Sequence, residues 1–290
     1  MNGNSLGISD GADNELFSPA WFVILYRYSS TRDRLLWIDD IKIEGAFYED
    51  NEAPVITVCK ASGRNSVEIT LNETPADEFI VPENFSLNSE GYKSVSVKKK
   101  KDLTYIIEFA NTMNNNSIHN LIIRKICDNS GNCTLNIHVP FSTLWAETGD
   151  VIISEIMADP TPEVSLPGKE YIEVTNRTDF SFNLKNWNLK SDDQRYPINE
   201  TIIRPSEIMI FCSLTDTALF TKYGRVTGLK QFPSLTDGGK IIYLTDSTGV
   251  LIHGVEYSSK WYGDELKSGG GWSLEMIDTG LPFFGEGNWT

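Results

Sequence analysis

Hydrophobic residues in this chain occur in short runs, and in many of these runs every second position is polar. Val67–Leu71 and Tyr171–Thr175 show this alternation, which places one side chain in a core and the next in water on a β-strand. Most runs are rich in Val, Ile, Tyr, Phe and Thr, which favour strands. Only residues 215–223 contain enough helix formers for a short helix, which would begin at Thr215 or Asp216. The pattern therefore predicts an all-β protein.

Turn signals separate the hydrophobic runs at short intervals. Asn129–Asn132, Asp237–Gly239 and Asp246–Gly249 are three examples, and such Gly- and Asn-containing turns are typical of antiparallel hairpins. Many short strands joined in this way predict β-sandwiches.

Two polar segments divide the chain. Glu49–Pro54 and Trp145–Gly149 each precede a new strand, and the first contains a proline. We therefore expect three parts, at residues 1–48, 53–143 and 149–290.

The last part contains a series of segments in a characteristic order: Asp150–Pro160, Lys169–Asn176, Leu184–Leu189, Ile208–Cys212, Phe232–Asp246, Val255–Asp264 and Gly270–Asp278. Together they resemble the bacterial, exported branch of the lamin tail domain. The resemblance implies an Ig-like β-sandwich. Members usually continue past a segment like Asn288–Thr290, which implies that this domain is truncated and that a sheet edge would be exposed.

The middle part resembles, through Val67–Pro75, Glu83–Leu87 and Cys127–Asn132, the bacterial Ig-like domain found in S-layer and other surface proteins. The expected fold is therefore a pair of tandem Ig-like β-sandwiches.

Near the N-terminus, Arg32–Gly45 resembles the closing strand of a lectin-like jelly roll, so residues 1–48 would be the remnant of such a domain. In some carbohydrate-binding jelly rolls an aspartate at this place ligates calcium. The resemblance implies that Asp39 or Asp40 could do so, although calcium takes about 6 to 8 oxygen ligands.

Charge narrows the set of partners. The 290 residues include 40 acidic and 25 basic ones, which gives a net charge of −15. This balance disfavours nucleic acid and anionic membranes, because both attract basic proteins. The longest apolar run, Ala20–Tyr26, is much shorter than the roughly 20 residues of a membrane-spanning helix. Membrane insertion is therefore not expected.

The first residues of this chain lack the charged and apolar regions of a signal peptide. The exported families that it resembles nevertheless imply an extracellular, cell-surface or periplasmic location. We expect the sequence to be a piece of a longer secreted protein.

The four cysteines lack the paired spacing of a structural zinc site. Cys127 and Cys133 bracket a turn-rich loop that could bring them within bridging distance, and two unpaired thiols are the alternative. Cys59 and Cys212 lie in apolar runs, where burial as free thiols is expected.

The sequence contains no recognisable catalytic constellation. Its three histidines stand apart from any acid–nucleophile pattern, and no G-x-S-x-G motif occurs. Asp192 and Asp193 are adjacent in a polar turn, where solvation is expected. We therefore expect neither an enzyme nor a cofactor, apart from the calcium considered above.

These expectations lead to a non-catalytic structural or interaction module of an exported bacterial surface protein. Its partner would be a protein or a cell-surface glycan, bound through Trp261, Tyr262 and Trp289, although the same aromatics could instead pack at strand ends. One alternative is an accessory carbohydrate-binding arm of a secreted hydrolase. A weaker alternative is a nucleic-acid-associated module.

Overall fold

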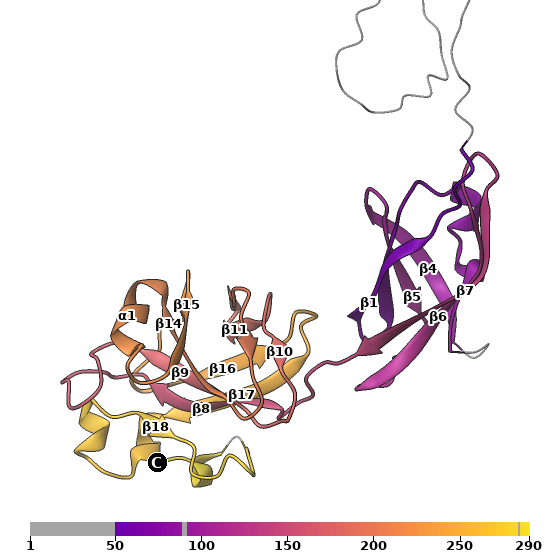
Figure 1. The fold of residues 1–290 in the computed structure, drawn as a ribbon. Coiled ribbons are helices and arrows are strands. Elements are labelled where there is room, and N and C mark those ends of the chain that lie inside the picture. The colour runs from indigo at the N-terminus through magenta and orange to yellow at the C-terminus, as the bar shows by residue number, and fades with distance from the viewer. Residues whose placement is uncertain (1–49, 89–91, 284) are drawn as a thin grey trace, which may run out of the picture.

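The computed structural model describes residues 50–88, 92–283 and 285–290, which form two β-domains joined by a short linker (Figure 1). The predicted jelly-roll remnant, with Asp39 and Asp40, lies outside the described residues. Within the described part, strands predominate and the single α-helix is one turn long. The predicted all-β class is confirmed.

The first domain contains one sheet of seven strands in the order β1-β2-β5-β4-β3-β6-β7. Strand β4 pairs with both β5 and β3, and the edge strands β1 and β7 lie close together, so the sheet wraps around a core. The elements are β1 (Ile56–Gly63), β2 (Ser66–Leu71), η1 (Asp77–Phe79), η2 (Pro82–Asn84), β3 (Phe85–Leu87), β4 (Tyr92–Lys101), β5 (Thr104–Phe109), β6 (Ser117–Cys127) and β7 (Cys133–Thr143).

Alternation along the strands builds the core of the first domain. In β5, Tyr105, Ile107 and Phe109 are buried while the residues between them are half-buried. Each fully buried side chain of this size contributes about 1.5–3 kcal/mol. On the outer face, Glu68 forms ion pairs with Lys60 and Lys100.

The second domain packs a four-stranded sheet, β12-β11-β16-β17, against a five-stranded sheet, β15-β14-β9-β8-β18. Strands β10 and β13 form a separate two-stranded ribbon. The strands are β8 (Val151–Met157), β9 (Tyr171–Asn176), β10 (Phe182–Asn183), β11 (Asn188–Ser191), β12 (Gln194–Pro197), β13 (Ile202–Ile203), β14 (Ile208–Ser213), β15 (Arg225–Leu229), β16 (Gly239–Thr245), β17 (Leu251–Ser258) and β18 (Leu274–Glu275). The helices are η3 (Leu214–Asp216), α1 (Thr217–Phe220), η4 (Ser259–Tyr262), η5 (Lys267–Gly269) and η6 (Glu286–Asn288).

The predicted short helix at 215–223 is represented by η3 and α1. It covers part of the outer face of the five-stranded sheet, where Phe220 lies against Tyr171 with ring centroids 5.2 Å apart. Strand β9 therefore buries Ile172 on its inner face and Tyr171 on its outer face.

The end of the described chain covers the edge of β18. Thr290 and Glu275 exchange backbone hydrogen bonds of 3.1 and 3.0 Å. The outer edge of β18 is therefore hydrogen-bonded to the last described residues.

Candidate functional site

The linker between the two domains is anchored at both ends. It joins β7 to β8, and two consecutive residues of it belong to different cores. Trp145 packs against the core of the first domain, whereas Ala146 is buried in the core of the second. The link thus passes from one core to the other within a single peptide bond.

Arg64 brings the first domain onto this linker from the turn between β1 and β2. Its Nη1 donates to both carboxylate oxygens of Glu147, at 3.1 and 3.3 Å, and its Nη2 donates to the Ala146 carbonyl at 3.1 Å. The guanidinium carbon also lies 5.4 Å from the centroid of the Trp145 ring, which is within the range of a cation–π contact.

The second domain provides Asp246 to the same guanidinium. The Asp246 carboxylate lies 3.8 Å from Arg64 Nη2 and is itself held by backbone N–H groups of Thr248 and Val250, at 2.8 and 2.9 Å. Because Asp246 is buried, its charge is only weakly screened by solvent. One arginine therefore contacts the first domain, the linker and the second domain.

Electrostatics at this junction favour the ionised form of Glu147. Burial raises the pKa of Glu147, but hydrogen bonds from Arg64 and Trp145, together with the arginine charge, lower it overall. Trp145 contributes through its ring Nε1, which donates to Glu147 at 2.6 Å. Beside these contacts lies a groove of about 250 Å³ lined by residues of both domains, including Trp187. We refer to these contacts of Arg64, Trp145, Ala146, Glu147 and Asp246 as the junction.

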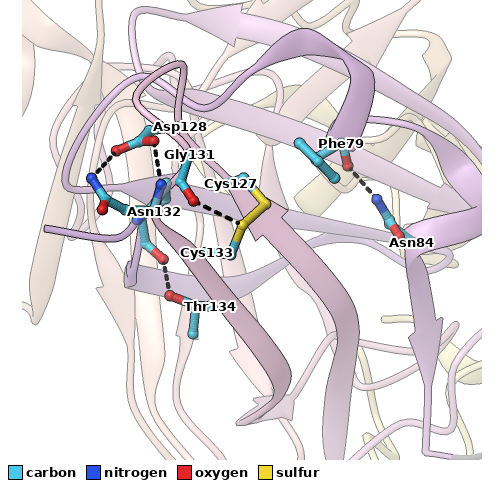
Figure 2. The surroundings of a disulfide bond; sticks show 9 residues. Phe79, Asn84, Cys127, Asp128, Gly131, Asn132, Cys133 and Thr134 are labelled. Carbon is cyan, nitrogen blue, oxygen red and sulfur yellow. Dashed lines mark hydrogen bonds between the residues drawn. A yellow bond between two sulfur atoms is a disulfide. The ribbon is translucent and has the colours of Figure 1, made fainter. Parts of the chain in front are cut away.

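A second group of polar residues lies at the other end of the first domain. Cys127 and Cys133 form a disulfide across the β6–β7 turn, which is one of the two alternatives left by the sequence. Figure 2 shows Asp128 beside this bridge, where its carboxylate accepts hydrogen bonds from the backbone and side chain of Asn132 at 2.8 and 2.9 Å. Burial raises the pKa of Asp128, but these hydrogen bonds lower it overall.

Asp128 also belongs to a carboxylate cluster with Asp50 and Glu73. One oxygen from each of the three side chains lies within 4.8 Å of the others, and among the described residues this is the group whose geometry could hold a metal ion. Burial and the charges of Asp50 and Asp128 raise the pKa of Glu73. Calcium takes about 6 to 8 oxygen ligands, so three carboxylates alone do not complete a calcium site.

Comparison with protein families assigns the second domain. Residues 146–259 match the family model of the lamin tail domain. We therefore call the second domain the lamin tail domain. A search of curated proteins found no match.

Comparison with solved structures gave matches of low similarity. The N-terminal part of the bacterial S-layer protein SbsC is 13% identical over 71% of this chain and 44% of that chain, with a TM-score of 0.35. For domains 1–6 of SbsC the values are 12%, 71%, 41% and 0.31. For an L,D-transpeptidase from Mycobacterium smegmatis they are 10%, 61%, 86% and 0.24. This chain thus spans less than half of the two SbsC structures.

The aromatics predicted to bind a ligand lie together in the lamin tail domain. Tyr262 and Trp289 are buried in its core, and Trp261 is half-buried against it, 6.0 Å from Trp289 between ring centroids. The Tyr262 hydroxyl donates to the Trp272 carbonyl at 2.6 Å. This arrangement matches the packing alternative, and a binding role for these three residues stays a prediction.

The lamin tail domain also carries a row of glutamates on the outer face of its five-stranded sheet. Glu275, Glu155 and Glu173 are register partners on β18, β8 and β9. Burial and the charge of Glu155 raise the pKa of Glu173, and the Tyr171 hydroxyl donates to Glu155. Glu173 therefore favours its protonated form beside the Glu155 carboxylate.

Two of the three histidines, His119 and His253, are buried and hydrogen-bonded. His119 is buried, and its two ring nitrogens lie 2.8 Å from the Asn88 side-chain amide and 3.0 Å from the Asn114 carbonyl. His253 is buried in the lamin tail domain, where it accepts a hydrogen bond from the Ile153 N–H at 3.2 Å. In these contacts, neither ring lies beside the acid and the nucleophile that a catalytic histidine would need.

The linker could be predicted from the sequence, but the arginine that contacts it could not. Arg64 and Asp246 are far apart in the sequence, and each lies in a polar turn between two strands. The local signal is that of an ordinary exposed turn. Only their proximity in the folded chain distinguishes them.

Proposed function

We propose that this chain is a non-catalytic structural module of an exported multidomain protein, in which the junction holds the lamin tail domain at a fixed orientation to the preceding sandwich. The observation that carries this proposal is the position of Arg64, which contacts the linker residues Ala146 and Glu147 and also Asp246 of the lamin tail domain. A module with a fixed orientation can hold the neighbouring domains of a longer protein at a set spacing.

The physical support comes from the combination of contacts. An exposed ion pair alone contributes about 0–1 kcal/mol, and Glu147 is half exposed. The two hydrogen bonds from Arg64 Nη1 to the Glu147 carboxylate, the cation–π contact and the buried Asp246 add to it. Because Trp145 and Ala146 are each packed in a core, the linker also has few free rotations. Flexible linkers, by contrast, are usually exposed polar segments that make few contacts with either domain.

The disulfide supports location outside the cytosol. Bridges such as Cys127–Cys133 form and persist in oxidising compartments and are rare in the cytosol. No helix in the described part of the chain has the length and hydropathy needed to span a membrane. We therefore propose a secreted or surface-exposed location.

The test is a measurement of interdomain order in the full 290-residue chain. Residual dipolar couplings from both domains should fit one alignment tensor in the wild type. Arg64→Ala should require two tensors, because it removes every contact of the guanidinium at the junction. Arg195→Ala is the matched control, since Arg195 is an exposed arginine on β12, away from the junction, and it should leave the single tensor unchanged.

Two results would overturn the proposal. The first is a wild-type chain whose domains already require independent tensors. The second is an Arg64→Ala variant that keeps the wild-type tensor, which would show that the junction does not set the orientation.

A further inference from the structure

A cleft opens in the first domain where β4 changes its partner strand. Tyr92 and Lys93 pair with β3, whereas β4 pairs with β5 from Ser94 onwards, and the register shifts between Ser94 and Ser96. Because β4 diverges from β3 at this point, a cleft of about 400 Å³ is left between η2, β3, β4 and the side of β6.

Two cations and a hydroxyl converge on this cleft. Ser86 on β3 is the register partner of Lys93 on β4 and of Ile122 on β6, so these side chains share one face of the sheet. Arg124 lies two residues after Ile122 and therefore points to the same face. Lys93, Arg124 and Ser86 all line the cleft.

The two cations of the cleft are unpaired among the described residues. No ion pair, side-chain hydrogen bond or ring contact engages Lys93 or Arg124. On the same strand, Lys98 and Lys100 each form an ion pair with a glutamate, at 3.0 and 2.6 Å, whereas Lys99 and Lys101 resemble Lys93 in forming none within the described part of the chain but do not line the cleft. In a chain of net charge −15, two unpaired cations facing one cleft are an unusual local excess of positive charge.

One acidic side chain, Glu83 of η2, lines the same cleft. Its carboxylate leaves the lining with a net charge of +1, and it can accept hydrogen bonds from hydroxyl groups, whereas it would only repel a bare anion. The lining therefore combines cations for an anionic group with acceptors for hydroxyls, in a space larger than one oxyanion.

We propose that this cleft binds an acidic sugar, with Lys93 and Arg124 contacting its carboxylate and with Ser86 and Glu83 hydrogen-bonding to its hydroxyls. A guanidinium binds carboxylates through two parallel hydrogen bonds, and the lysine adds a point charge beside it. This binding function goes beyond the spacing role and does not depend on the junction.

The experiment titrates the full chain with sodium glucuronate at low salt and follows the backbone amide signals of Ser86, Lys93 and Ser94. Saturable shifts with a dissociation constant on the order of 1–10 mM are expected for a few charge-assisted hydrogen bonds. Arg124→Ala and Lys93→Ala should each weaken binding about tenfold. Lys99→Ala is the matched control, because Lys99 is an exposed lysine on β4 that does not line the cleft.

Parallel titrations with glucose and with sodium sulfate, at matched ionic strength, separate the two halves of the recognition. The proposal requires that both bind more weakly than glucuronate. It is overturned if glucuronate gives no saturable shift, if glucose or sulfate binds equally well, or if Lys99→Ala weakens binding as much as Arg124→Ala. All three substituted side chains are exposed, so the variants should keep the fold.

Discussion

Acidification should destabilise the lamin tail domain through one buried histidine. His253 of β17 is 2% exposed, and the Ile153 N–H of β8 donates to its Nδ1. A proton on Nδ1 would place two donors against each other. Burial, with a smaller effect from the charge of Arg177, lowers the pKa of His253 from 6.5 to about 4, although the Pro282 carbonyl partly opposes this.

The size and sign of the effect follow from proton linkage. Because the folded pKa lies below the unfolded value, the unfolded chain binds more protons between pH 6.5 and about 4. Stability is therefore fully present above pH 6.5 and is lost as the pH falls towards 4. A shift of this size corresponds to about 3 kcal/mol of unfolding free energy.

The assay compares the wild type with His253→Gln, whose neutral amide can still accept from Ile153 but does not titrate. The unfolding of the lamin tail domain in urea is measured at pH 7.5 and pH 4, with hydrogen exchange in peptides from β8 as the readout. The wild type should lose about 3 kcal/mol more than the variant over this range. Equal losses, or a folded-state His253 that titrates near pH 6.5 by NMR, would refute the reasoning.

Three further variants test other parts of the structure. Glu173→Gln should raise the melting temperature at pH 9 more than at pH 5, because the raised pKa of Glu173 beside Glu155 means that the wild type loses stability as this proton is released. Replacing Cys127 and Cys133 by alanine should lower the unfolding free energy of the first domain by about 2 kcal/mol in urea titrations, and an unchanged value would contradict the bridge. Gly239→Ala should cost at least about 1–3 kcal/mol by thermal unfolding, because φ is +133° and the new Cβ would lie 2.5 Å from a carbonyl oxygen of β17.

The strand pattern could be predicted from the sequence because it is local. In β2, Val67, Ile69 and Leu71 are buried as the alternation requires. The same rule failed at β9, where alternation predicted that Tyr171 and Ile172 would divide between solvent and core. Both are buried because the segment around Phe220, distant in sequence, covers the outer face of the sheet.

The environment of the charged residues could also be predicted only in part from the sequence. The run Lys98–Lys101 has a charge pattern typical of a solvated hairpin tip, and it ends β4 at the turn to β5. Its pairing was not readable, because Glu108 and Glu68 lie on other strands and reach Lys98 and Lys100 across the sheet. Ion pairs between strands depend on register, and register cannot be derived from the local charge pattern alone.

The two candidate sites both form where the regular strand pattern stops. Arg64 lies in the turn that ends β1, and Lys93 lies where β4 exchanges one partner strand for another. In its turn, the long Arg64 side chain can extend beyond its own strand pair, whereas Lys93 stays paired with β3 at the edge of the cleft. Arg64 then meets groups of the other domain, whereas Lys93 meets no described partner. The first arrangement is therefore suited to holding two domains together, and the second to receiving an anionic ligand from outside the chain.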